Sequence, residues 1–136
     1  MTARSNASAL RQELRRLAKR ATQVTDKAVG VRREVLAASL SKTYKVCGKP
    51  NCKCARGEKH PVYHLCWSED GRRRSTHIRD DEFLKIQAAA SRYRHLRQCR
   101  AELLKIASEQ ASLIDALVEV LSIPPPDKSG AGGASR

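Results

Sequence analysis

The chain has 136 residues, and its 27 Lys and Arg against 14 Asp and Glu give a formal net charge of +13 at pH 7. One Phe, one Trp and three Tyr leave little material for a large core, which argues against a large enzyme fold. No stretch approaches the ~20 apolar residues of a membrane span, and no apolar signal sequence begins the chain. We therefore expect a cytoplasmic protein without a membrane partner, associated with the bacterial nucleoid if it binds DNA.

The positive charge is concentrated in the first part of the chain. Residues 1–79 hold 19 basic and 6 acidic side chains, whereas residues 80–136 hold 8 of each. This asymmetry predicts a basic part that faces a polyanion and a balanced part that faces another protein or a second copy. Nucleic acid is the expected polyanion, with DNA favoured over RNA. Solubility alone and an anionic membrane surface are the alternative explanations of the charge.

The N-terminal segment, residues 1–41, is predicted to hold two helices. Residues 7–22 place apolar side chains at helical spacing, with Arg and Lys opposite. Residues 27–40 are predicted as a second helix, because Thr25 and Asp26 form a capping signal before it. The first helix carries the basic residues that we expect to track a nucleic-acid backbone: Arg11, Arg15, Arg16, Lys19 and Arg20.

The next segment, residues 42–79, is predicted to contain short strands. Residues 42–46 are expected to be extended, and from Pro61 the apolar side chains follow a period of two. Asp70 and Gly71 are typical of a hairpin turn, so residues 73–79 should return as the second strand of one antiparallel pair. This return strand should present a strongly basic face. The cations expected to bind nucleic acid here are Arg72, Arg73, Arg74 and Arg79.

Residues 80–123 contain no Gly or Pro, begin with an acidic triplet and end at three prolines, which predicts one long amphipathic helix or two with a subtle break. One apolar seam follows a 3,4 spacing from Leu96 to Val120, and a parallel second stripe runs from Leu104 to Leu121. The helix should either fold back on the N-terminal helices or join a second copy or a larger protein through residues 83–121. Residues 124–136 are predicted to be a disordered tail.

Between the predicted strands lies the pattern Cys-x4-Cys-x-Cys-x5-His, formed by Cys47, Cys52, Cys54 and His60. Thiolates and imidazole suit a tetrahedral Zn²⁺ site, and nearby Gly, Pro and Asn allow the required turns. A closed set of four ligands leaves no open position, so the zinc would be structural. His64 and Cys66 compete with His60 as fourth ligand, and His60 is preferred because it lies nearest. The surrounding cations, expected to bind nucleic acid, are Lys45, Lys49, Lys53, Arg56 and Lys59.

The remaining reactive side chains have simpler interpretations. Cys66 is read as a small apolar residue of the hairpin and Cys99 as a packing residue of the long helix. His64 and His77 are read as polar strand residues able to face a phosphate. No phosphate-binding Gly-rich loop, HisGluXXHis or separated carboxylate set is present, so we do not expect an enzyme. Redox chemistry without metal is a weaker alternative, because no Cys-x2-Cys precedes a helix.

Residues 47–60, the strand at 62–68, the basic strand at 71–78 and the helical run at 91–97 together resemble a family of small bacterial proteins of uncharacterised function, frequently found among mobile genetic elements. The resemblance covers about residues 42–107. Where that family usually has HisGlyProTyr, this chain has His60, Pro61, Val62 and Tyr63. The resemblance implies a metal knuckle and a DNA-related setting.

These observations predict an α+β protein, mostly α, with N-terminal helices, a small zinc knuckle with a β-hairpin, and a long C-terminal helix. The expected function is that of a zinc-dependent DNA-binding accessory protein that assists a recombinase, a transposase or similar machinery. The alternative is an assembly or adaptor subunit, with or without RNA binding, whose long helix is the main interaction surface.

Overall fold

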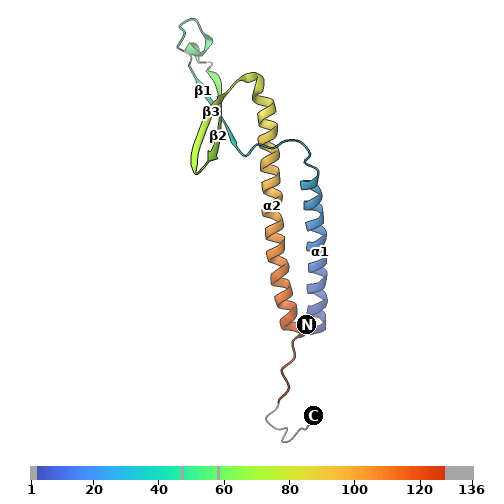
Figure 1. Ribbon diagram of the computed structural model, residues 1–136. Helices are drawn as coiled ribbons and strands as arrows, with labels where there is room; N and C mark the ends of the chain where they lie inside the picture. The colour runs from blue at the N-terminus through green and yellow to red at the C-terminus, as the bar shows by residue number, and fades with distance from the viewer. Residues whose placement is uncertain (1–2, 47, 58, 128–136) are drawn as a thin grey trace. The chain divides into compact units, whose positions relative to one another are not determined.

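The computed structural model describes residues 3–46, 48–57 and 59–127 (Figure 1). Its elements are α1 (Ala3–Val29), β1 (Ser39–Lys45), the short 3₁₀ helix η1 (Lys53–Arg56), β2 (His60–Glu69), β3 (Arg72–Ile78) and α2 (Asp80–Leu121). The predicted α+β class is therefore confirmed, as are the hairpin and the long helix. The sequence predicted disorder over residues 124–136. Of these, residues 128–136 lie outside the described residues.

The chain forms two compact units. The first combines the start of α1, up to Gln23, with the end of α2, from Leu103. The second runs from Val24 to Glu102 and contains the whole sheet. Within its described helices, the chain has no segment long and apolar enough to cross a membrane.

In the first unit, α2 packs beside α1 through the apolar seam predicted from the 3,4 spacing. Leu17 of α1 and Ile106 of α2 are buried, and Leu113 lies half-buried beside Leu17 along a shared groove. Of the two arrangements considered for the long helix, this unit therefore contains the one in which it folds back on the N-terminal helix. A seam of apolar residues at 3,4 spacing is typical of a helix that packs against another helix. Here α1 is the helix that covers the seam.

The second N-terminal helix predicted over residues 27–40 is wrong. The helix α1 instead continues through Thr25 and Asp26 and ends at Val29, and the amide of the following Gly30 donates to the Asp26 carbonyl at 3.0 Å. The following segment is held against α2, because the Leu36 amide donates to the Ala89 carbonyl at 3.1 Å and Arg92 Nε donates to the Glu34 carbonyl at 2.8 Å. These tertiary hydrogen bonds replace the intrahelical ones that the pattern predicted.

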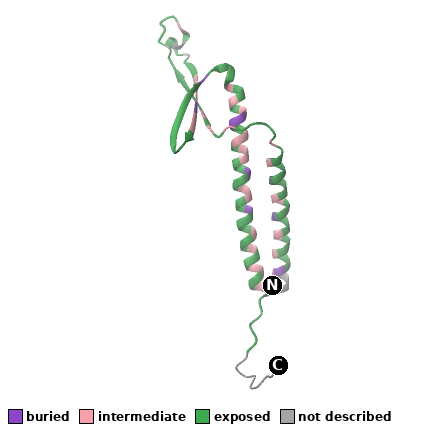
Figure 2. Cartoon of the chain, in the orientation of Figure 1, coloured by how far each residue is buried: buried purple, intermediate pink, exposed green. Residues whose placement is uncertain are grey.

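The sheet has three antiparallel strands in the order β1-β2-β3, where the sequence predicted a single pair. The register places Lys45 opposite His60 at one end of β2 and Glu69 opposite Arg72 at the other. Residues of β2 with odd numbers face α2, since the rings of Tyr63 and Phe83 stack at 4.0 Å. Leu65 and Ile78 are buried on this side, whereas most of β1 and β3 is exposed (Figure 2). The buried Ala89 of α2 is covered by the segment before β1, whose Leu36 amide donates to the Ala89 carbonyl.

The β2–β3 turn is built from Asp70 and Gly71, whose φ angles are 52° and 76°. Two successive positive φ angles are typical of a type I′ turn, which favours Gly at the second position. We expect Gly71→Val to lower the free energy of unfolding of this unit by about 1–2 kcal/mol, because a branched side chain is strained there. Urea denaturation measures this, with Asp70→Asn as a control that should be near neutral. Equal stability of both variants would contradict the turn.

Candidate metal knuckle and nucleic-acid interface

The loop that joins β1 to β2, residues 46–60, is called here the knuckle. Its base is closed by the sheet register, which sets Lys45 beside His60. Gly48 and Gly57 reverse the chain at φ angles of 81° and 113° that side chains rarely adopt. Within the loop, the amide of Cys52 donates to the Lys49 carbonyl and the amide of Ala55 donates to the Cys52 carbonyl, both at 3.1 Å. The predicted turns are therefore present.

Two of the four predicted zinc ligands lie together in the knuckle. Cys52 is half-buried, and its Sγ lies 2.8 Å from Nε2 of His60. Cys47 and the side chain of Cys54 lie outside what the structure describes, and within the described part of the chain no three potential ligands gather. Tetrahedral zinc would hold sulfur and nitrogen about 3.5 Å apart, so metal binding requires the pair to open by about 0.7 Å. The donor chemistry and the meeting of these two side chains fit a zinc ion.

The geometry of β2 separates the competing fourth ligands. His64 lies four residues beyond His60, about 13 Å along the strand, and Cys66 lies about 20 Å away. The His64 ring instead lies 4.3 Å from the His77 ring, across the β2–β3 ladder. A metal ion bound by Cys52 and His60 is therefore out of reach of both alternatives. Cys99 is buried in α2, as the packing interpretation predicted.

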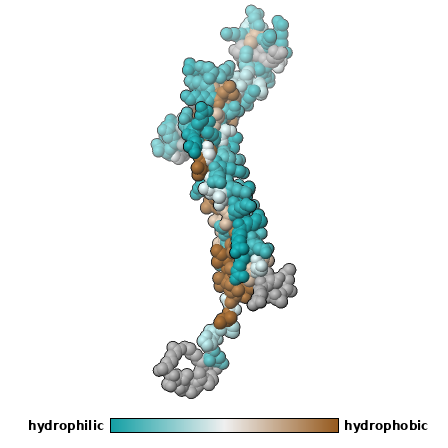
Figure 3. All heavy atoms as spheres, turned by 90° about the vertical axis from the view of Figure 1, so that its right-hand side faces the viewer, coloured by the Kyte–Doolittle hydropathy of each residue, from teal (hydrophilic) through white to brown (hydrophobic). Residues whose placement is uncertain are grey.

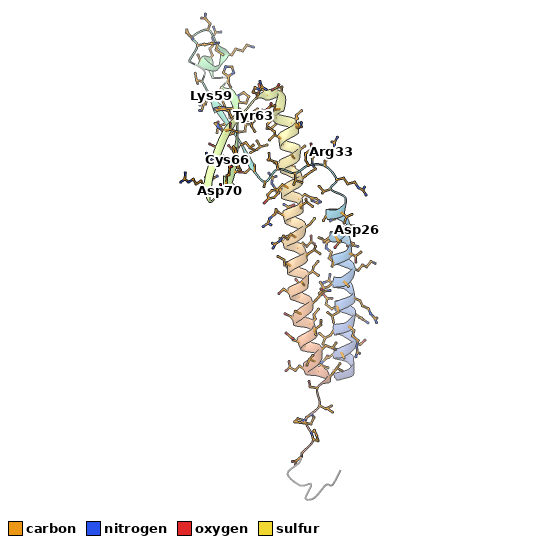
Figure 4. The ribbon with its side chains drawn as sticks, in the orientation of Figure 1. Asp26, Arg33, Lys59, Tyr63, Cys66 and Asp70 are labelled. Carbon is orange, nitrogen blue, oxygen red and sulfur yellow. The ribbon has the colours of Figure 1, made fainter. Side chains whose placement is uncertain are left out.

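The predicted cations of the sheet region form two groups rather than one. The knuckle group is exposed and consists of Lys45, Lys49, Lys53, Arg56 and Lys59. Arg79 lies apart from it: it directly follows β3, about 20 Å from Arg73, and is ion-paired with Glu82 at 3.2 Å and Asp81 at 3.8 Å. The hairpin arginines, which are also exposed, are Arg72, Arg73 and Arg74. The length of β2 places these groups about 30 Å apart. Figure 4 labels Lys59 near one end of the sheet and Asp70 at the other, with Tyr63 and Cys66 between them.

The hairpin arginines do not share one face, contrary to the basic strand face expected from the sequence. Arg74 is opposite Trp67 and points to the side of α2, whereas Arg73 is opposite Ser68 and points to the other side. They are accessible because they lie at the end of the hairpin. Arg74 approaches Glu69 at 3.7 Å, while Arg72 and Arg73 have no ion-pair partner among the described side chains.

The sheet side turned away from α2 connects the two cationic groups and is mostly polar, with Val62 and Cys66 as its half-buried apolar members. Called here the open face, it carries Ser41, Thr43, Lys45, His64, Arg73, Ser75 and His77. All of these except His64 are exposed. Sequence reasoning named its histidines but missed its hydroxyl residues, because the polar alternation of residues 39–45 identifies a face only once β1 is paired with β2.

A family model described as a domain of unknown function (DUF6788) matches residues 8–88, more than half of the chain. The chain belongs to the DUF6788 family. No curated protein and no solved structure matches the chain. The family match contains the knuckle, all three strands and the start of α2, where Asp80, Asp81 and Glu82 form the first helical turn as predicted.

The DUF6788 match also covers the basic strip of α1, which belongs to the other unit. Arg11, Arg15 and Lys19 are exposed at intervals of four residues and so share one side of the helix. Arg16 donates from Nε to Glu13 at 3.0 Å, and this hydrogen bond lowers the pKa of the Glu13 carboxyl. Arg20 is half-buried and already interacts within the chain. Three of the five predicted cations therefore face solvent without a carboxylate partner among the described residues.

One cation of the sheet belongs neither to the two cationic groups nor to the basic strip of α1. Lys42 lies over the rings of Tyr44 and Tyr63, with its Nζ 5.3 Å and 5.7 Å from their centroids. The hydrogen bond with Tyr44 raises the pKa of this ammonium group. The two aromatic contacts hold its charge on the side of α2, away from the open face.

Proposed function

We propose that the chain is a DNA-binding accessory protein without catalytic activity, and that a structural zinc ion bound by Cys47, Cys52, Cys54 and His60 orders its knuckle. The observation that carries the proposal is the pairing of two exposed cationic groups across one polar sheet face. Phosphate contacts position proteins on DNA, and hydroxyl and imidazole donors add to those made by Lys and Arg.

The spacing of the two groups supports a duplex as the ligand. About 30 Å separates the knuckle group from the hairpin arginines, close to the ~34 Å of one turn of B-DNA. The open face would then lie along one side of the duplex and reach phosphates nearly one turn apart. The strip of Arg11, Arg15 and Lys19 gives the other unit a separate backbone contact.

The proposed zinc ion has a clear structural task. Pairing of β1 with β2 ends at Lys45 and His60, and the fourteen residues between them carry few apolar side chains to fold around. Ligands at both ends of this loop would fix the knuckle cations relative to the sheet, as metal binding supplies folding energy in small domains.

The biological setting is proposed from the resemblance of residues 42–107 to proteins frequently found among mobile genetic elements. We place the chain beside a recombinase or transposase acting on the same DNA, in the cytoplasm and at the nucleoid. The long helix α2 would contribute the protein contact.

A second candidate, an assembly or adaptor subunit that binds structured RNA or no nucleic acid, is favoured by one observation. Large apolar side chains of α2, including Leu104, Ile114 and Val118, are more than half exposed. Such a surface is typical of protein contacts.

Duplex length tests the first candidate against the second. A fluorescently labelled 16-base-pair DNA spans both cationic groups, whereas an 8-base-pair DNA, about 27 Å long, is shorter than their separation of about 30 Å. We expect the 16-mer to bind at least tenfold more tightly than the 8-mer at 0.1 M salt in fluorescence anisotropy, because both groups contribute phosphate contacts. Equal affinity for the two lengths, or tighter binding to an A-form RNA duplex, would contradict the proposed DNA contact.

A further inference from the structure

An apolar stripe runs along a side of α2 that α1 does not cover. Its members repeat at intervals of 3 and 4 residues, and all are exposed: Leu104, Ala107, Ala111, Ile114, Val118 and Leu121. Leu104 and Val118 are 55% and 60% exposed, although a heptad spacing of apolar residues is typical of a covered helix contact. The stripe is about 26 Å long. Figure 3 shows a hydrophobic patch where α1 begins and α2 ends.

The stripe has definite ends. On the same line of the helix, the next positions toward the N-terminus are the exposed Arg100 and Arg97. Toward the C-terminus, α2 itself ends at Leu121, and prolines follow from Pro124. The partner that covers the stripe must therefore match a segment of about five helical turns.

The stripe complements itself when two copies run antiparallel about a two-fold axis near Ser112 and Leu113. Ala111 then lies opposite the second copy's Ile114, and Ala107 opposite the second copy's Val118. Leu104 lies opposite Leu121 in the same way. The four inner layers each combine a small with a large side chain, and each of the two outer layers holds two leucines. A parallel alignment would stack Ala on Ala and Ile on Ile.

The charges at the two ends of the stripe also favour the antiparallel arrangement. The last turn of α2 holds no basic residue, so the partial negative charge of its terminal carbonyls lacks a cation of its own. In the antiparallel alignment, Arg100 of each copy reaches this end of the other helix. In a parallel alignment, Arg100 would face Arg100 and Arg97 would face Arg97, where like charges repel.

We infer that a second copy of this chain covers the stripe and forms an antiparallel, two-fold symmetric dimer through residues 104–121 of α2. The inference rests on the proposed role of α2 as the protein contact, and it names the partner. It depends on neither the zinc ion nor DNA binding. The dimer carries two copies of every cationic group described above, as expected of closed two-fold oligomers.

Sedimentation equilibrium of the full chain tests the dimer. We expect a mass near twice 15.1 kDa for the unmodified protein and near 15.1 kDa for Ile114→Asp, because a carboxylate in the central layer cannot be buried. Ser112→Asp adds the same charge in the same turn, off the stripe, and should leave the dimer intact. Circular dichroism checks that both variants keep their helices. A monomeric unmodified chain at 100 µM, or an Ile114→Asp dimer, would overturn the inference.

Arg100→Gln tests the direction of the helices. The antiparallel arrangement predicts a dimer dissociation constant that rises about threefold to thirtyfold, since two Arg contacts with helix ends are lost. A parallel arrangement predicts tighter association, since two facing positive charges are removed. A lower dissociation constant would therefore overturn the antiparallel register. DNA binding is measured separately, so a monomer that binds duplex DNA would refute the dimer and leave the proposed DNA contact standing.

Discussion

Replacement of the hairpin arginines Arg72, Arg73 and Arg74 by alanine should weaken binding to duplex DNA by about 100-fold or more near 0.1 M salt. Each lost phosphate contact removes about 0.9 from the slope of log K against log salt, so the slope should become shallower by about 2.7. If about six phosphates are contacted, the unmodified chain has a slope near −5. Anisotropy titrations at four salt concentrations give both quantities.

A matched variant separates contact from net charge. Lys85, Arg94 and Lys105 are exposed cations of α2 that lie outside both cationic groups and the α1 strip. Their replacement by alanine removes the same charge, and we expect the slope to change by less than about 1. Equal losses in the two triple variants would mean that only the net charge of +13 matters, which contradicts a defined interface.

Loss of the proposed metal should have the largest effect on the sheet unit. Cys52→Ser, or treatment with a strong chelator, should release the proposed zinc and abolish the protection of residues 46–60 from amide hydrogen exchange, because on this proposal the metal supplies the folding energy of the loop. DNA affinity should fall with it, since the knuckle cations lose their fixed position. The pairing of α1 with α2 in the other unit should keep its protection.

Cys66→Ser is the control for the metal experiment. Cys66 is about 20 Å from His60 along β2 and should not affect zinc content. Loss of zinc in Cys66→Ser with retention in Cys52→Ser would reverse the ligand assignment. Retained DNA affinity in zinc-free Cys52→Ser would show that the knuckle needs no metal.

Local sequence patterns predicted the elements whose ends are set by helix-capping, helix-breaking and turn residues. The acidic start at Asp80 and the prolines after Ile123 predicted both ends of α2 to within two residues. Asp70 and Gly71 identified the hairpin turn. Residues 27–40 were assigned to a helix because their spacing suits one, but the Leu36 amide and the Glu34 carbonyl are hydrogen-bonded to α2, which lies more than 50 residues away in the sequence. Long-range pairing of this kind has no local signal.

The candidate site was predictable in its parts but not in its arrangement. The motif identified Cys52 and His60, which meet at 2.8 Å, and it left His64 and Cys66 open until the strand geometry separated them. All the cations predicted to bind nucleic acid are exposed except Arg20, which is half-buried, and their binding to nucleic acid stays a prediction. Their division into two groups depends on the ten-residue length of β2 and on the pairing of β1, neither of which residue spacing alone determines.

The metal content and ligand set of the purified full chain test the central claim most directly, namely that a zinc ion orders the cationic knuckle. Elemental analysis combined with X-ray absorption at the zinc edge should find one zinc per chain, bound by three sulfurs at about 2.3 Å and one nitrogen at about 2.0 Å. A chain that carries no metal and nevertheless protects residues 46–60 from hydrogen exchange would contradict the claim.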